Sequence, residues 1–136
     1  MDDFWYMYVK KRVFDKIKKT SMPYLESKYA DVNFTSQAIT ETPSKFPCVE
    51  ITELPGAEQG MTLENDEVAG YLATFQVNVY SEKGDSVAWD VMSEIITHFK
   101  KDLRFTLVAM PISSKIGGIT RYTARCRRMV AGGDKI

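Results

Sequence analysis

The stretch that decides the fold is VAGYLATFQVNVY, residues 68–80. Apolar and more polar side chains alternate along it with a period of two, which predicts a β-strand with one buried face. The side chains of the apolar face are Tyr71, Ala73, Phe75, Val77 and Val79. Ser81-Glu82-Lys83-Gly84 then turns the chain, so we expect this strand to be followed directly by another element.

A helix is expected on the N-terminal side of this strand, over residues 3–20. Its apolar residues recur every four positions, and the other sides are filled with Lys and Arg. The apolar positions are Trp5, Val9, Val13 and Ile17. We expect Ser21-Met22-Pro23 to end or kink this helix, because proline disfavours helical geometry in the residue before it. Residues 24–29 could then continue as a short second piece.

A second helix is expected on the C-terminal side, from Asp85 or Ser86, either of which can cap it, to about Lys101. It carries an apolar stripe of helical spacing, Ala88, Val91, Met92, Ile95 and Phe99. This helix is the one segment that we expect to serve as a crossover connection between strands.

Four further strands are expected, at residues 32–40, 48–52, 105–110 and 119–130. We expect Pro111 to end the third of these, and the Gly117-Gly118 turn to lead into the fourth. Residues 54–66 contain Pro55, Gly56 and Gly60, and they are expected to form a long acidic loop.

The expected fold is α+β, with element order α-β-β-β-α-β-β. It has a mainly antiparallel (mixed) sheet with both helices packed on one face. A chain of 136 residues fits a single domain, 1–136, which can bury one hydrophobic core. Its glycine-containing tail, residues 131–136, is expected to be frayed.

The charge of the chain is divided between its segments, although the net charge is zero. Residues 46–82 contain seven acids and no Lys or Arg, whereas residues 83–136 carry a net charge of +5. Patches of opposite sign favour self-association or docking to a partner, and the alternative is that these charges only keep the surface solvated. No apolar run is long enough to span a bilayer, and Met1-Asp2-Asp3 is unlike a secretory signal. We therefore expect synthesis in the cytosol.

The sequence contains no phosphate-binding glycine loop, dinucleotide-binding turn or nucleophile elbow. The single histidine, His98, is expected to be partly buried and structural, since a catalytic base needs a positioned partner. Cys48 and Cys126 lie far apart in sequence and are expected to be buried, reduced thiols. We therefore expect no enzymatic activity, no metal site and no cofactor.

The best candidates for an interface are charged residues. Arg121, Arg125 and Arg127 share one face of the last strand, where guanidinium groups could bind carboxylates of a partner or remain solvated. The acidic candidates are Glu53, Glu58, Glu64, Asp66 and Glu67. The bases between Lys10 and Lys19 could instead bind nucleic acid, although the neutral chain argues against this and a solvated helix face is the alternative.

The C-terminal half resembles a known family. The string Val77-Asn78-Val79-Tyr80-Ser81-Glu82-Lys83 is followed by the second helix, a strand near Phe105 and a glycine turn. The string Ile119-Thr120-Arg121-Tyr122-Thr123-Ala124-Arg125 closes the pattern. A strand ending in Val-Tyr-Ser, a helix and a last strand with an Arg-Tyr pair are similar to the tail-terminator, or tail-completion, proteins of bacteriophage tails.

This resemblance implies a ring, expected to be hexameric, that caps the tail tube and stops its polymerisation. The implied partners are further copies of the chain, the tube protein, possibly the sheath, and the neck or head connector where a head exists. DNA would only pass through the lumen. The implied location is the bacterial cytoplasm during assembly and then the head-proximal end of the tail. Two alternatives stay open, a head-closure or neck component and, more distantly, a small nucleic-acid-binding regulator.

Overall fold

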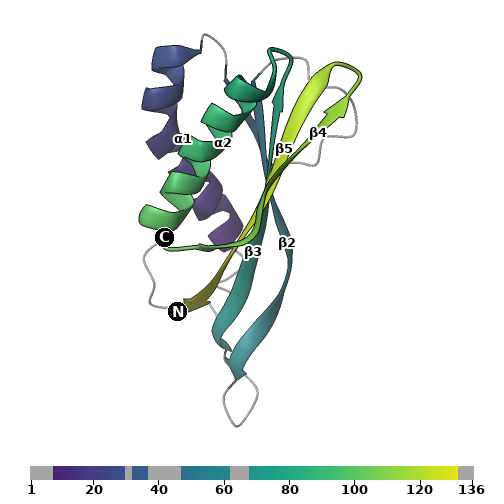
Figure 1. Ribbon diagram of the computed structural model, residues 1–136. Coiled ribbons are helices and arrows are strands. Elements are labelled where there is room, and N and C mark those ends of the chain that lie inside the picture. Colours follow the sequence, from purple (N-terminus) through teal and green to yellow (C-terminus); the bar gives the residue numbers. More distant parts are fainter. Residues whose placement is uncertain (1–7, 30–31, 37–46, 62–67, 132–136) are drawn as a thin grey trace.

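The computed structural model describes residues 8–29, 32–36, 47–61 and 68–131. These residues form two helices and one 5-stranded mixed sheet, in the order α1-β1-β2-β3-α2-β4-β5. Both helices lie side by side on the same face of the sheet (Figure 1). The expected α+β class and element order are therefore confirmed.

The long strand β3, Val68–Ser81, lies at the centre of the sheet, whose order is β1-β2-β3-β5-β4. It pairs antiparallel with β2, Cys48–Met61, on one side and with β5, Ile119–Ala131, on the other. The last strand in the sheet, β4, Thr106–Ile116, pairs antiparallel with β5, so β3 and β4 run parallel with β5 between them. The helix α2, Asp85–Lys101, connects β3 to β4 and is the expected crossover.

The strand β2 differs from the expectation, because residues 54–61 belong to the strand and not to a loop. A register shift between Leu54 and Ala57 accommodates Pro55 and Gly56 as an irregularity of the ladder. Backbone pairing with the strongly alternating β3 outweighs the local preference of proline and glycine for a turn. Residues 62–66 of the expected loop lie outside the described residues. The first strand, β1, is only Asn33–Thr35 and pairs parallel with Cys48–Glu50.

The helix α1, Val9–Lys28, also differs, because it continues through Pro23 where an end or a kink is expected. Proline has no N–H for the carbonyl of residue 19 and normally costs a helix stability. The buried stripe nevertheless extends past it, from Val9, Val13 and Ile17 to Ser21 and Leu25. Burial of Leu25 against the core therefore helps to hold the last turn in place.

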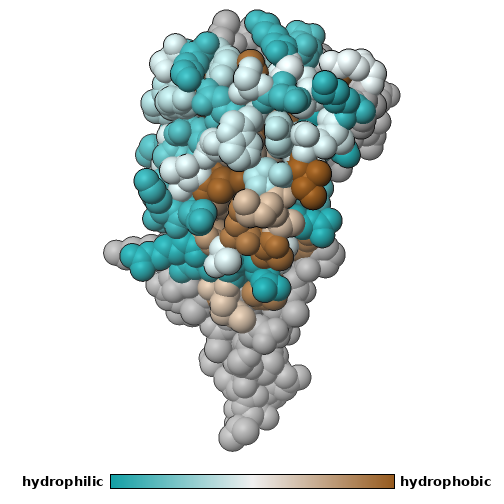
Figure 2. All heavy atoms as spheres, viewed as in Figure 1, coloured by the Kyte–Doolittle hydropathy of each residue, from teal (hydrophilic) through white to brown (hydrophobic). Residues whose placement is uncertain are grey.

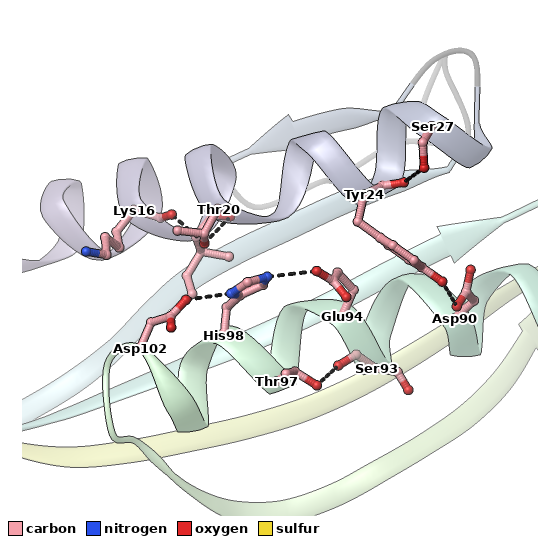
Figure 3. Close-up of polar contacts among 11 residues, drawn as sticks. Lys16, Thr20, Tyr24, Ser27, Asp90, Ser93, Glu94, Thr97, His98 and Asp102 are labelled. Carbon is pink, nitrogen blue, oxygen red and sulfur yellow. Dashed lines mark hydrogen bonds and ion pairs between the residues drawn. The ribbon is translucent and has the colours of Figure 1, made fainter.

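Asp90 of α2 provides a second anchor for the end of α1. Its carboxylate accepts hydrogen bonds from the hydroxyls of Tyr24 at 2.9 Å and Tyr29 at 2.7 Å, and from Lys28 Nζ at 3.3 Å. Figure 3 shows Tyr24 reaching across to Asp90. Burial would raise the pKa of Asp90, but the bonds from Tyr29, Tyr24 and Lys28 outweigh it and lower that pKa. The carboxylate therefore stays charged and ties the two helices together.

The strand β4 passes through Pro111, where the sequence predicts its end. Proline is tolerated because β4 is an edge strand, so the missing N–H does not interrupt a second ladder. Two register shifts, between Leu107 and Ala109 and between Ala109 and Ile112, bend this edge. The Gly117-Gly118 turn before β5 is confirmed, and both glycines have positive φ.

The expected stripe of α2 is confirmed, since its five residues are buried. The expected capping by Asp85 or Ser86 is wrong, because Gly84 occupies the cap position and no side chain caps the helix. Phe99 of α2 packs between Phe75 of β3 and Phe105 at the start of β4, with ring centroids 6.1 and 5.3 Å away. Phe75 and Phe105 are themselves 5.7 Å apart, so the three rings form one aromatic junction.

Replacing Pro23 by alanine should stabilise the protein. The Pro23→Ala variant restores an N–H in the interior of α1 and can add the missing bond to the carbonyl of residue 19. We expect the free energy of unfolding to rise by roughly 1–3 kcal/mol, measured by urea denaturation. A decrease would mean that the irregularity at Pro23 is required for the packing of α1.

Truncating the aromatic junction should destabilise the protein strongly. Phe99 is fully buried, so Phe99→Ala should lower the free energy of unfolding by about 3–5 kcal/mol in the same assay. Ile112→Ala is a control, because it removes apolar atoms from a residue that is 69% exposed. The control should change the value by less than about 0.5 kcal/mol. Equal effects of the two variants would contradict the assigned core.

Candidate functional site

The sheet has one face covered by the helices and one face without them, here called the helix-free face. The registers of β3 and β5 assign each residue to a face. Phe75 lies opposite Cys126 on the covered face, and Gln76 lies opposite Arg125 on the helix-free face. Arg121, Arg125 and Arg127 alternate with buried residues of β5 and therefore share the helix-free face, as predicted.

Arg125 and Arg127 are exposed on this face. Arg125 Nε donates a 3.0 Å hydrogen bond to Gln76 Oε1 of the neighbouring strand, and Arg127 lies opposite Thr74. Both arginines stand on β5, an interior strand, so they present charge from the surface of the sheet and not from its edge. Two exposed guanidinium groups on a rigid strand are suited to bind carboxylates of a partner.

Arg121 differs from the other two arginines because it is half-buried. It lies opposite Tyr80, and its Nε is buried without a hydrogen-bond partner among the described residues. Burial and the charge of Glu50 raise the pKa of Tyr80, while a hydrogen bond with Arg121 opposes that rise. Arg121 is thus anchored beside Tyr80, and it is a weaker candidate for a partner contact than Arg125 or Arg127.

A polar ladder across three strands also lies on the helix-free face, and the sequence reasoning missed it. Asn78 of β3 donates a hydrogen bond from Nδ2 to Glu50 Oε1 of β2 and accepts one at 2.6 Å from Thr123 Oγ1 of β5. Glu50 and Asn78 are only 4% and 5% exposed, so these bonds satisfy buried polar groups. The signal in the sequence is Asn78 itself, an amide placed between two valines of the central strand.

The structure places one of the acidic candidates, Glu53, relative to the arginines. Glu53 of β2 lies opposite Phe75, which assigns it to the helix-covered face, where it is half-buried. Glu58 lies in β2 opposite Tyr71, but its side chain is not among those that the structure describes. Glu64, Asp66 and Glu67 lie outside the described residues. Of the acidic candidates, only Glu53 has a described side chain, and it does not share the face of the arginines.

Exposed apolar side chains on β4 and β5 form a second feature that the sequence reasoning missed. The exposed fractions are 48% for Val108, 71% for Met110, 69% for Ile112 and 48% for Met129. Figure 2 shows brown spheres gathered at the middle of the molecule, in the region of β4 in Figure 1. The sequence feature that points to this apolar surface is the absence of charged residues from 105–114, which is unusual for an edge strand.

The basic residues of α1 are exposed and point away from the core. These residues are Lys10, Lys11, Arg12, Lys16, Lys18, Lys19 and Lys28. Lys10 and Lys11 line an open depression of about 360 Å³ with Phe14, Asp15 and Ser36. This surface lies apart from the helix-free face, because α1 covers the opposite side of the sheet (Figure 1).

His98 lies on α2 between two carboxylates, as Figure 3 shows. Its Nδ1 is 2.5 Å from Asp102 Oδ2 and its Nε2 is 2.7 Å from Glu94 Oε1, which favours the doubly protonated ring. Burial would lower the pKa of His98, but the hydrogen bonds to Asp102 and Glu94 outweigh it and raise that pKa above 6.5. The predicted structural histidine is thus partly buried, and its ring nitrogens are occupied.

Cys48 and Cys126 are free and buried, as predicted. Burial raises the pKa of Cys48 to about 11 and that of Cys126 to about 12, so both thiols stay protonated at neutral pH. Across the described residues, no group of three or more His, Cys, Asp or Glu side chains could hold a metal ion. The described helices include none long and apolar enough to cross a membrane.

Comparison of the sequence with models of known protein families gives no match, and comparison with curated proteins gives none either.

The His98 cluster should make stability depend on pH. The pKa of His98 is higher in the folded protein than its ordinary value of 6.5, so the charged ring stabilises the fold. The whole of this stabilisation is present below pH 6.5. This contribution should be lost as the pH rises through the folded-state pKa. We expect wild type to lose its advantage in stability over His98→Gln as the pH rises above 6.5, measured by urea denaturation. Thr97→Ala, an exposed neighbour, should retain the wild-type pH profile, and a profile unchanged in His98→Gln would contradict the assignment.

Proposed function

We propose that this protein is a structural assembly protein that caps the tail tube of a phage or phage-tail-like particle as a ring. In this role it ends polymerisation of the tube and forms the interface between tail and neck. A ring of six copies is the expected assembly. The chain needs no cofactor for this function, and its partners are other copies of itself, the tube protein and a neck protein.

The observation that carries this proposal is the placement of two sequence strings, residues 77–83 and 119–125, which carry the resemblance to the tail-terminator family. Val79, Tyr80 and Ser81 at the end of β3 lie directly opposite Tyr122, Arg121 and Thr120 of β5. Residues some forty positions apart thus form one cross-strand unit, with Tyr80 and Arg121 in contact through a hydrogen bond. This agreement between sequence resemblance and geometry supports the assignment to a tail-terminator-like protein.

The distribution of charge on the described surface also supports an assembly role. Arg125 and Arg127 stand exposed on the helix-free face, and exposed apolar residues of β4 lie at the adjacent edge. A surface that combines apolar side chains with arginine is typical of the buried part of protein interfaces. Carboxylates of another copy, whose segment 46–82 contains seven acids, or of the tube protein would complement this charge.

The test is reconstitution with the tube protein from the same particle. We expect negative-stain images to show rings, or tubes that end in a ring, and tubes that stop growing at a defined length. The double variant Arg125→Glu/Arg127→Glu should weaken capping by roughly tenfold or more, because it reverses the charge offered to carboxylates. The matched control Lys18→Glu/Lys19→Glu changes the net charge equally on exposed positions of α1 and should cap normally.

Persistent monomers with no affinity for the tube protein would contradict the proposal. Binding to a head connector in the absence of any tube binding would instead favour a head-closure or neck protein. The nucleic-acid alternative has its own specific observation, the six exposed bases of α1 from Lys10 to Lys19. It predicts DNA binding that weakens steeply with salt and is lost in the Lys18→Glu/Lys19→Glu control.

A further inference from the structure

The outer side of α1 carries a concentration of positive charge. Residues 10–19 contain six bases and one acid, Asp15, which leaves a net charge of +5 in ten residues. The six bases are all exposed and are here called the α1 basic face: Lys10, Lys11, Arg12, Lys16, Lys18 and Lys19. With a rise of 1.5 Å per residue, this face is about 14 Å long. Like charges held this closely repel one another, so an anionic partner would stabilise them.

No carboxylate of the described residues neutralises the α1 basic face. Its six side chains form no ion pair or hydrogen bond within the described part of the chain. Carboxylates of α2, the helix packed beside α1, are engaged elsewhere. Asp90 binds Lys28 at the end of α1, at 3.3 Å. Glu94 and Asp102 bind His98 of their own helix. The α1 basic face therefore presents its charge to any partner that approaches it.

An open depression lies at one end of this face. Its volume is about 360 Å³, and it is lined by Lys10 and Lys11 together with Phe14, Asp15 and Ser36. Ammonium groups and a hydroxyl are hydrogen-bond donors that suit phosphate oxygens. The carboxylate of Asp15 adds one negative charge, which the two lysines outweigh. The depression thus offers one position for a phosphate group.

The composition of the α1 basic face favours phosphates over a protein or membrane surface. Five of its six bases are lysine, which is depleted in protein interfaces and binds phosphate as a point charge. The large apolar side chains that are exposed in the described structure all lie outside residues 10–19. The face therefore lacks the apolar anchors of protein interfaces and the apolar side that inserts into a membrane. A row of phosphates needs neither of these.

We propose that the α1 basic face binds the phosphate backbone of duplex DNA without reading its sequence. Residues 10–19 contain no Asn or Gln and only one Arg, so few side chains suited to reading base edges are present. This inference goes beyond the capping function and rests on the charges of α1 alone. The face lies on the opposite side of the sheet from Arg125 and Arg127 (Figure 1), so DNA and an acidic protein partner would meet different surfaces.

Fluorescence anisotropy with two short labelled duplexes of unrelated sequence tests this proposal. We expect equal affinity for the two duplexes. A face about 14 Å long spans about four phosphates of one strand, so log K should fall with log salt concentration with a slope of roughly −3 to −4. The neutral double variant Lys18→Ala/Lys19→Ala should reduce the steepness of this slope by about two, because each lysine that binds a phosphate contributes about one.

Charge reversal provides a matched pair of variants. Lys18→Glu/Lys19→Glu should weaken DNA binding by roughly tenfold or more. Arg125→Glu/Arg127→Glu changes the net charge equally on the helix-free face and should bind DNA as wild type does. Circular dichroism should show both variants folded, since all four positions are exposed. Equal losses in the two variants would overturn the assignment to α1.

Competitors identify the class of partner. Displacement of DNA by polyglutamate, or by phosphatidylserine vesicles, at an equal concentration of charge would overturn DNA as the partner. The first result would favour an acidic protein and the second a membrane surface. Absence of binding at low salt, or a strong preference for one duplex, would overturn backbone binding.

The outcomes also separate this inference from the proposed function. Capping of tubes by a protein that does not bind DNA would overturn the inference and leave the capping function intact. DNA binding by a protein that does not cap tubes would support the inference and contradict the capping function.

Discussion

The packing of Phe99 between Phe75 and Phe105 is the interaction on which the rest of the structure depends. It joins the central strand, the crossover helix and the start of β4, three parts of the chain that are separated by turns. Arg104, the residue just before Phe105, adopts a left-handed backbone conformation with φ of 59°. This conformation turns the chain after α2 and directs Phe105 into the core. Among the described strands β4 pairs only with β5, so its position on the sheet depends on this junction.

The central strand β3 separates two kinds of chemistry. On the covered face its side chains are apolar and pack against the helices, and the free energy of folding comes mainly from their burial. On the helix-free face its polar side chains bind their neighbours across the sheet, as Asn78 does with Glu50 and Thr123. The helix-free face can therefore present arginines to a partner without disturbing the core, because alternate residues of one rigid strand serve the two roles.

The parts of the fold that could be predicted are those where local pattern and tertiary packing agree. The alternation of β3, the stripe of α2 and the glycine turn before β5 were each visible in the sequence and lie where they were expected. Three errors concern an element expected to end at proline or glycine: Pro23 within α1, Pro55 and Gly56 within β2, and Pro111 within β4. In each case contacts with distant residues compensate for a local preference to break the element.

The sequence by itself determined the α+β class, the residues of the core and the common face of Arg121, Arg125 and Arg127, because periodicity encodes which side of an element is buried. Only the tertiary structure decided the order of the strands, and with it which strand is an edge. That order places the uncharged run from Phe105 to Ser114 at the border of the described sheet and the arginines on an interior strand. The crossover through α2 was expected from the sequence, but strand order also follows from long-range pairing, which leaves no local pattern in the sequence.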